Sequence, residues 1–326
     1  MRINKVNLPL MKLCYKNILF FCFLSIVSST YAQTPFEDFK KRAQSRYNKW
    51  KGKDNVGVVS TSGDDKRYSK KIELGSSDIT TWGLVVGVSS YSSMQSLKYA
   101  DDDAYKMYSF LKSPEGGSVK DENIQLLIDE DATKENIFAS LHDIVQKADS
   151  NDVIFFYFSG HGLEGAFLPF DYGQQSWQGQ KLVRDTTKVV GHQLLADIFA
   201  SSKAKHKLCF ADACHSGSLS MAKSGTIPNN QYYKALESTK GGLALFTSSR
   251  TEEISLEHKG VRQGVFSHYL IEGMNGIADQ NQDYIVTIAE LYDYVSEKVK
   301  SYTNYQQTPT IGGAFDPLAP VSLIRK

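Results

Sequence analysis

Short apolar runs, each closed by glycine, serine or a turn, are the feature that most limits what this chain can fold into. They lie at Trp82–Val88, Ile124–Ile128, Val153–Phe158, Leu208–Ala211 and Leu243–Phe246. Continuous runs of this length are typical of strands that are buried on both faces of a parallel sheet. Helical spacing fills most of the stretches between them, so the sequence predicts an α/β fold with helices covering a mostly parallel sheet.

The expected helices alternate with these strands. They cover Asp101–Leu111, a segment capped by Thr133, Leu194–Ala200, and two regions near Val265–Met274 and Thr287–Ser301. Residues 218–242 contain many polar and small residues and are expected to form a long loop.

The first 32 residues differ from the rest of the chain. They hold four basic residues and no acidic one, an apolar core from Ile18 to Val27, and a small residue at Ala32. This pattern is typical of a secretory signal peptide, and its apolar part is short for a membrane-spanning helix. We expect cleavage after Ala32 and a periplasmic or secreted protein without a stable membrane anchor. An uncleaved anchor is the alternative.

Residues 33–77 are interpreted as a basic pro-segment or linker, and residues 78–326 as the folded domain. Residues 33–76 hold 11 basic and 6 acidic side chains, a net charge of +5, whereas residues 77–326 hold 22 and 30, a net charge of −8. Nucleic-acid-binding domains are themselves basic, so no nucleic-acid partner is expected. The basic segment could dock on the acidic domain, or it could be a solvated spacer.

A histidine and a cysteine follow two of the predicted strands. His161 lies in Ser-Gly-His-Gly after Val153–Phe158, and Cys214 lies in Asp-Ala-Cys-His-Ser-Gly after Leu208–Ala211. Chemistry in open α/β sheets collects at the carboxyl ends of strands, so the thiol and the imidazole are expected at one edge. Together they suggest a nucleophile and its base, whereas either residue alone would more simply be packed core.

The neighbours of this pair have different expected roles. His215 would point to the opposite face from Cys214 and is a poor base. The backbone N–H groups of Gly162 and Cys214 are the expected oxyanion donors. Cys209 lies in the middle of a predicted strand and is expected to be packed core.

The stretches Val153–Gly162 and Lys207–Ser218 resemble the catalytic motifs of caspase-fold cysteine peptidases, most of all the bacterial metacaspase-type branch. Weaker support comes from Ala100–Ala104, Gly264–Gly276 and Gln307–Pro309, and the resemblance covers roughly residues 78–320. It implies the caspase-like (caspase-haemoglobinase) fold, with a central, mostly parallel six-stranded sheet. It also implies a Cys–His dyad with no obligatory third member, peptide-bond hydrolysis through a thioester, and no required cofactor.

The resemblance also implies a substrate. Caspases that cut after aspartate need a basic pocket, whereas Asp212 stands two residues before Cys214 here. Metacaspases build a pocket for Arg or Lys from three positions that correspond to Asp212, Ser159 and Asp103. Paired carboxylates suit a guanidinium group. For Asp103, a plain role as an acid at a helix N-terminus is the alternative.

Calcium is possible in such a protein, but no dependence on it is expected. Many metacaspases bind calcium through acids after the catalytic residues, and these are not evident between Gly162 and Asp171 or near Met221. A separate EF-hand-like spacing comprises Asp279, Asn281, Asp283 and Glu290. Tyr284 replaces the glycine of that loop, which favours a polar turn before the last helix instead.

Taken with the motifs, these features predict an exported cysteine endopeptidase acting on peptides or proteins with Arg or Lys before the scissile bond. Lys223, Lys234 and Lys240 are candidate self-cleavage sites, and the basic segment would occlude the pocket of a zymogen until removed. Three alternatives stay open: a catalytically silent caspase-fold binding or scaffold protein, a same-fold peptidase of different specificity, and a cysteine transferase.

Overall fold

The structure is a computed structural model and describes residues 79–213, 241–250, 253, 255–258, 260 and 262–324. Several sequence predictions lie outside these residues: the signal peptide, the basic segment, Cys214, His215 and the three candidate cleavage lysines.

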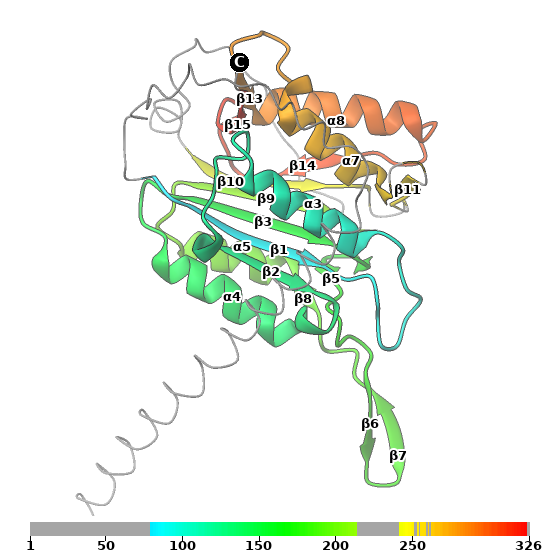
Figure 1. Cartoon of the computed structure of the whole chain (residues 1–326). Helices are drawn as coiled ribbons and strands as arrows, with labels where there is room; N and C mark the ends of the chain where they lie inside the picture. The colour runs from blue at the N-terminus through cyan, green and yellow to red at the C-terminus, as the bar shows by residue number, and fades with distance from the viewer. Residues whose placement is uncertain are drawn as a thin grey trace, which may run out of the picture. The chain divides into compact units, whose positions relative to one another are not determined.

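A six-stranded sheet in the order β14-β10-β9-β3-β1-β2 forms the centre of the folded domain (Figure 1). Its strands are β1 (Thr81–Gly87), β2 (Ile124–Ile128), β3 (Val153–Ser159), β9 (His206–Asp212), β10 (Gly242–Thr247) and β14 (Thr310–Gly312). Every neighbouring pair is parallel except β10–β14, which is antiparallel. The predicted six-stranded, mostly parallel sheet is therefore confirmed.

Helices cover both faces of this sheet (Figure 1). On one face lie α3 (Ala100–Lys112), α7 (Val265–Glu272) and α8 (Ile288–Tyr302), and on the other lie α4 (Lys134–Lys147) and α5 (His192–Ser201). Two of the starts have side-chain caps: Thr133 accepts from the N–H of Asn136, and Thr287 forms a capping box with Glu290. All five predicted helices are present.

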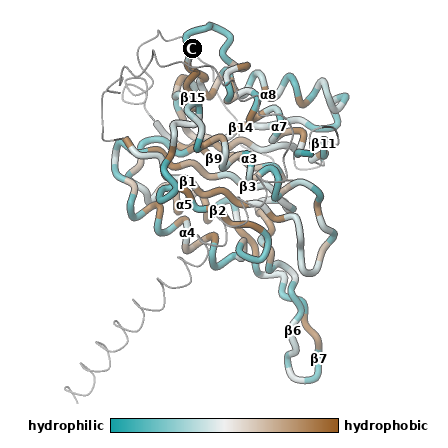
Figure 2. Tube along the Cα trace, in the orientation of Figure 1, coloured by the Kyte–Doolittle hydropathy of each residue, from teal (hydrophilic) through white to brown (hydrophobic). Residues whose placement is uncertain are grey.

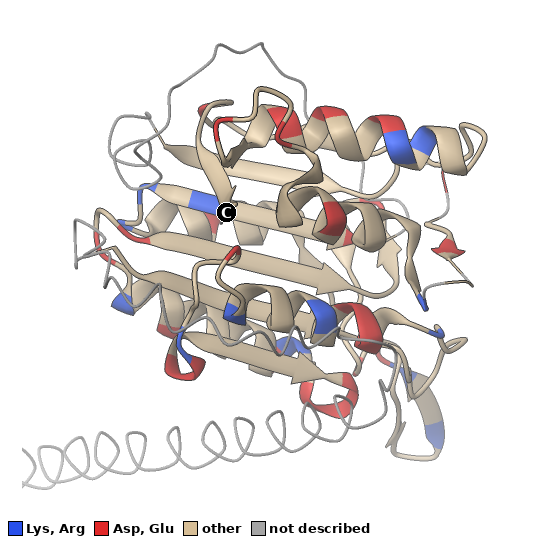
Figure 3. Cartoon of the chain, turned by 45° about the horizontal axis from the view of Figure 1, so that its top comes forward, with Lys and Arg blue, Asp and Glu red and all other residues tan. Residues whose placement is uncertain are grey.

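The core lies between the sheet and its helices. Hydrophobic residues follow the central strands (Figure 2), and Lys, Arg, Asp and Glu lie mostly on helices and loops (Figure 3). Every residue of β3 is buried, with Phe158 stacked on Phe167 at 4.8 Å between ring centroids. Burial on both faces explains why the strands read as continuous apolar runs. Within the described ranges, no helix is long and apolar enough to cross a membrane.

Short strands and helical turns accompany the main sheet, and none of them was expected from the sequence. The strands are β4 (Gly162–Leu163), β5 (Ala166–Phe167), β6 (Gln175–Gln178), β7 (Lys181–Arg184), β8 (Val190–Gly191), β11 (Glu257–His258), β12 (Gln263–Gly264), β13 (Ile285–Thr287) and β15 (Pro320–Leu323). The helical turns are η1 (Asp121–Asn123), η2 (Asp129–Asp131) and η3 (Gly273–Ile277). Strands of two to four residues are too short to show a period. The antiparallel β6–β7 hairpin projects from the domain (Figure 1).

Candidate active site

The register between β3 and β9 defines the edge where the predicted catalytic residues belong. Ser159 is the register partner of Asp212, and the N–H of Gly160 donates to the carbonyl of Asp212 at 3.1 Å. His161 follows the first strand by two residues, and Cys214 follows the second by two. Two parallel neighbouring strands therefore carry the two motifs to one edge of the sheet. The position of Cys214 itself lies outside the described residues, so the dyad stays a prediction.

His161 is half-buried and is held by the segment between β1 and α3. Its backbone N–H donates to the hydroxyl of Tyr91 at 2.7 Å, and the two rings lie 4.8 Å apart between centroids. Its Nε2 lies 2.8 Å from the backbone oxygen of Gln95. A carbonyl can only accept, so the neutral imidazole carries its proton on Nε2 and leaves Nδ1 as the basic nitrogen.

Asp103, Ser159 and Asp212 come together beneath this edge, from α3, β3 and β9. All three are at most 5% exposed. The hydroxyl of Ser159 donates to Oδ2 of Asp103 at 3.1 Å. Burial, followed by the charge of Asp212, raises the pKa of Asp103 well above its usual value, and burial raises the pKa of Asp212. The three residues that the sequence predicts to bind the substrate thus form one buried acidic cluster.

The N-terminus of α7 holds both carboxylates. The N–H of Gly264 donates to Asp103, with 3.1 Å to each carboxylate oxygen. Asp212 Oδ2 accepts from the N–H of Ser267 at 3.1 Å and from its hydroxyl at 2.7 Å. The positive end of the helix partly offsets the two negative charges. Among the described residues, no Lys or Arg forms an ion pair with either carboxylate.

The three acids at the start of α3 have separate partners. Asp101 accepts from the hydroxyl of Ser89 at 2.7 Å, and Asp102 pairs with Arg262 at 2.8 Å. Asp103 instead points to Gly264 and the buried cluster. A role limited to the helix N-terminus therefore does not account for Asp103.

Ser248, which follows β10, forms hydrogen bonds with Ala213, the residue before the predicted nucleophile. Its hydroxyl accepts from the N–H of Ala213 at 3.1 Å and donates to the carbonyl of Ala213 at 3.0 Å. The carbonyl of Ser248 in turn accepts from the fully buried side chain of Gln307 at 3.0 Å. Neither Ser248 nor Tyr91, Gln95 or Ser267 was identified from the sequence.

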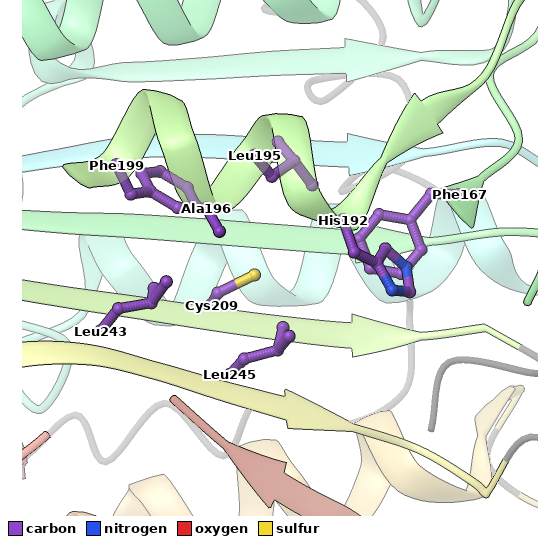
Figure 4. A pocket seen from close by; sticks show the side chains of 8 residues that line it. All are labelled: Phe167, His192, Leu195, Ala196, Phe199, Cys209, Leu243 and Leu245. Atoms are coloured by element: carbon purple, nitrogen blue, oxygen red, sulfur yellow. The ribbon is translucent and has the colours of Figure 1, made fainter. Parts of the chain in front are cut away.

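Other predicted site residues lie as follows. Gly162 is buried at the start of β4, paired with Phe167 of β5, and its role as an oxyanion donor stays a prediction. Cys209 is 2% exposed, as expected of packed core, and burial raises the pKa of its thiol. It lines an apolar pocket against α5, on the opposite face of the sheet from α3 and Asp103 (Figure 4).

The EF-hand-like residues are engaged within their own turn. Asp279 accepts from the N–H groups of Asp283 and Tyr284 at 3.2 and 3.0 Å. Glu290 completes the capping box at the start of α8. Across the residues that the structure describes, no three His, Cys, Asp or Glu side chains are grouped so as to hold a metal ion. These contacts are those of the polar turn that the sequence favours, and the expectation about calcium stays a prediction.

The sheet order and the two neighbouring strands that lead to the motifs fit an α/β domain of the caspase type. The caspase-domain family matches residues 80–314, and the chain belongs to this family of cysteine peptidases. The family assignment and the fold expected from the sequence are both confirmed.

Individual relatives are distant. A probable protease from a Desulfuromonadales bacterium is 25% identical over 67% of this chain and 29% of its own length. Metacaspase-1 of Eremothecium gossypii is 31% identical, over 41% of this chain and 31% of that protein. Metacaspase-4 of Arabidopsis thaliana is 29% identical, over 43% and 34%. The matches thus span about a third of these relatives.

One solved structure, a protein from Geobacter sulfurreducens, matches at 14% identity and a TM-score of 0.48, over 76% of this chain and 100% of that one.

Proposed function

We propose that the protein is an exported cysteine endopeptidase that cuts after Arg or Lys, with Cys214 as nucleophile and His161 as base. Membership of the caspase-domain family supports the peptidase chemistry. The observation that carries the specificity is the buried pair of Asp103 and Asp212, joined to Ser159 at the strand ends that lead to both motifs.

The charge and the burial of the two carboxylates both favour a substrate with a long, positively charged side chain. Two buried carboxylates without an ion-paired cation among the described residues repel one another, and a guanidinium or ammonium group would relieve that repulsion. Both carboxylates are at most 5% exposed, so a substrate group must reach inward to meet them. Arginine and lysine combine a positive charge with that reach, and arginine can bind in a bidentate manner.

The proposed reaction starts with transfer of the thiol proton of Cys214 to Nδ1 of His161. The sulfur attacks the scissile carbonyl, and the oxyanion is held by the N–H groups of Gly162 and Cys214. His161 then protonates the leaving amine, which leaves a thioester on Cys214. Water, deprotonated by His161, hydrolyses the thioester and restores the thiol. No step in this route requires a metal ion.

The test uses fluorogenic peptides with arginine, lysine or aspartate before the scissile bond. Wild-type protein should cleave the first two and not the third, and Cys214→Ala should cleave none. Each assay is run with calcium and with a chelator, because dependence on calcium is a separate question. Failure of both the wild-type protein and the protein without residues 33–76 to cleave any of the peptides, under either condition, would refute the peptidase proposal.

We further propose that the chain is made as an exported zymogen. The supporting pattern is the signal-like segment 1–32, followed by a segment of net charge +5 before a domain of net charge −8. N-terminal sequencing of protein recovered from the periplasm and medium should begin at Gln33. Deletion of residues 33–76 should increase activity on an arginyl peptide, and unchanged activity would remove the case for occlusion.

Lys223, Lys234 and Lys240 are the proposed self-cleavage positions. Incubated wild-type protein should give fragments whose new N-termini follow one or more of these lysines, and Cys214→Ala should stay intact. The same fragments from both proteins would point to a contaminating protease.

A further inference from the structure

The segment between β1 and α3, residues 88–99, carries two groups that hold His161. These are the hydroxyl of Tyr91 and the carbonyl of Gln95. The carbonyl matters for chemistry because it selects the tautomer that leaves Nδ1 free to take a proton. Whatever fixes this irregular segment therefore also fixes the orientation of the proposed base.

Contacts at both ends fix the segment to the domain. The N–H groups of Ser89 and Ser90 donate to Asp129 Oδ1, each at 2.8 Å. At the far end, the N–H of Lys98 donates to Glu257 Oε1 at 2.7 Å. Gln95 lies between these ends, so a contact nearer the middle of the segment would act more directly on its carbonyl.

That middle contact comes from the β6–β7 hairpin. The Nη2 group of Arg184, the last residue of β7, donates to the carbonyl of Ser93 at 2.9 Å. The hydroxyl of Ser93 donates to the carbonyl of Tyr172, just before the hairpin, at 2.7 Å. Ser93 is thus held by hydrogen bonds through both its backbone and its side chain, two residues before Gln95.

The hydrogen bond from Arg184 to Ser93 depends on a neighbouring glycine. Gly173 has a φ of +69°, and a Cβ there would lie 2.5 Å from Nε of Arg184 and 2.9 Å from Oγ of Ser93. The N–H of Gly173 donates to the carbonyl of Asp185 at 2.7 Å, which closes the base of the hairpin. The absent side chain leaves room for the guanidinium to reach Ser93.

The base of the hairpin is itself fixed. Asp171 is buried, accepts from the N–H of Lys134 at the start of α4 at 2.9 Å, and pairs with Lys188 at 2.9 Å. Arg184 therefore extends from a hairpin whose base is fixed and contacts the irregular segment 88–99.

We propose that Arg184 is a positioning residue for catalysis: by holding the carbonyl of Ser93 it places the carbonyl of Gln95, which orients His161. The proposed action of Arg184 runs through residues 93–95, since its hydrogen bond is to the carbonyl of Ser93. The inference rests on the proposed function only in that His161 is taken as the base.

The experiment uses the full chain with four changes: Arg184→Leu, Arg184→Lys, Ser93→Ala, and Arg184→Leu combined with Ser93→Ala. Because Tyr172 gives Ser93 a second anchor, the double variant should show the largest effect. We expect its kcat on an arginyl peptide to fall roughly 10- to 100-fold, as expected for a misplaced catalytic group. KM should stay within about twofold, because substrate binding is unchanged.

A second readout does not depend on turnover. In protein labelled with ¹⁵N-histidine, the signals of His161 are assigned by their loss in His161→Gln. Wild-type protein should show the Nε2–H tautomer, and the double variant should show a mixture of both tautomers. Arg184→Lys should fall between wild type and Arg184→Leu, because an ammonium group retains a donor without the planar fork.

Lys181→Leu is the matched control, since it removes another exposed cation from the same strand, β7. It should leave kcat and the histidine spectrum unchanged. An unaltered kcat and spectrum in the double variant would overturn the proposal, as would an equal fall in the control. A rise in KM alone would also overturn it, because Arg184 would then act on the substrate. If neither the wild-type protein nor the protein without residues 33–76 cleaves a peptide, the proposed function fails, and the spectrum alone decides the positioning role.

Discussion

The N–H of Gly264 donates to both carboxylate oxygens of Asp103, each at 3.1 Å, across 161 positions of the chain. This contact joins the start of α7 to the start of α3 and encloses the buried acidic cluster. It exists because position 264 has no side chain: a Cβ there would lie 2.1 Å from Oδ2 of Asp212 and 3.1 Å from Oδ2 of Asp103.

Gly264→Ala should therefore damage the substrate pocket. Carboxylates held from several sides cannot give way easily, so we expect overpacking to cost about 1–3 kcal/mol of stability. Cleavage of arginyl peptides should fall at least tenfold, mainly through KM. Melting curves and steady-state kinetics give both values.

Gly191→Ala is the control for that change. Gly191 also precedes a helix, with an N-cap φ of −67° against −60° at Gly264, and no atom of the described residues lies within 4 Å of a Cβ built there. Its stability and activity should match wild type. Equal effects at both glycines would mean that the helix caps, and not the carboxylates, set the cost.

Asp103→Asn should change how stability depends on pH. Burial and the charge of Asp212 raise the pKa of Asp103, so the folded protein holds this proton more tightly than the unfolded chain, whose aspartate pKa is about 3.9. The resulting stability is fully present below pH about 4 and is lost as the pH rises through the folded-state pKa. Asparagine cannot ionise and avoids that loss.

We therefore expect Asp103→Asn to melt about 2–4 °C higher than wild type at pH 7, as on the order of 1 kcal/mol produces in a domain of this size. Below pH about 4 the two melting temperatures should converge. The variant should also lose cleavage of arginyl peptides, which is the cost of removing one carboxylate. Thermal denaturation across this pH range tests the prediction. A variant that melts at a lower temperature than wild type at pH 7 would show that ionised Asp103 does not destabilise the fold.

Tyr91→Phe should weaken the hold on His161 while keeping the aromatic ring. The hydroxyl accepts from the N–H of His161 and donates to the carbonyl of Leu168 at 3.0 Å. Losing both bonds should cost about 1–3 kcal/mol, because the hydroxyl is buried. We expect kcat to fall roughly tenfold through misplacement of the base. Tyr292→Phe, which removes a bond of 3.4 Å to Pro309 elsewhere, should leave kcat unchanged.

Ser248→Ala should disturb the approach to Cys214. It leaves the N–H and carbonyl of Ala213 without their hydroxyl partner at a fully buried position, at a cost of about 1–3 kcal/mol. Ser140→Ala is the matched comparison, because Ser140 is 1% exposed and its hydroxyl has no hydrogen-bond partner among the described residues. The first variant should lose stability and kcat, whereas the second should gain slightly in melting temperature. The reverse order would show that the Ala213 contacts are not important.

The sequence was sufficient for the main sheet because its parallel strands are buried on both faces. Such strands give continuous apolar runs, and all five parallel strands fall on the predicted runs. β14 gave no such signal, since it is a three-residue edge strand with one buried position. The other short strands were missed for the same reason of length.

The site divides in a similar way. Asp212 and Ser159 could be found because they flank the two motifs along the chain, and their register partnership follows from the strand order. Tyr91, Gln95 and Ser267 could not, because they meet their partners only after distant segments close on one another. Gln95 acts through its backbone carbonyl, which any residue would supply, so its identity carries no signal.

The pairing of β9 with β10 has a consequence for the chain as a polymer. The two strands align from His206–Gly242 to Ala211–Thr247, and β14, on the far side of β10, extends the same sheet. A cut anywhere between residues 213 and 241 would therefore divide the polypeptide but leave its two pieces joined by backbone hydrogen bonds and a shared core. Such a cut could alter the activity of the enzyme while the two pieces stay associated, so that no reassociation step is needed.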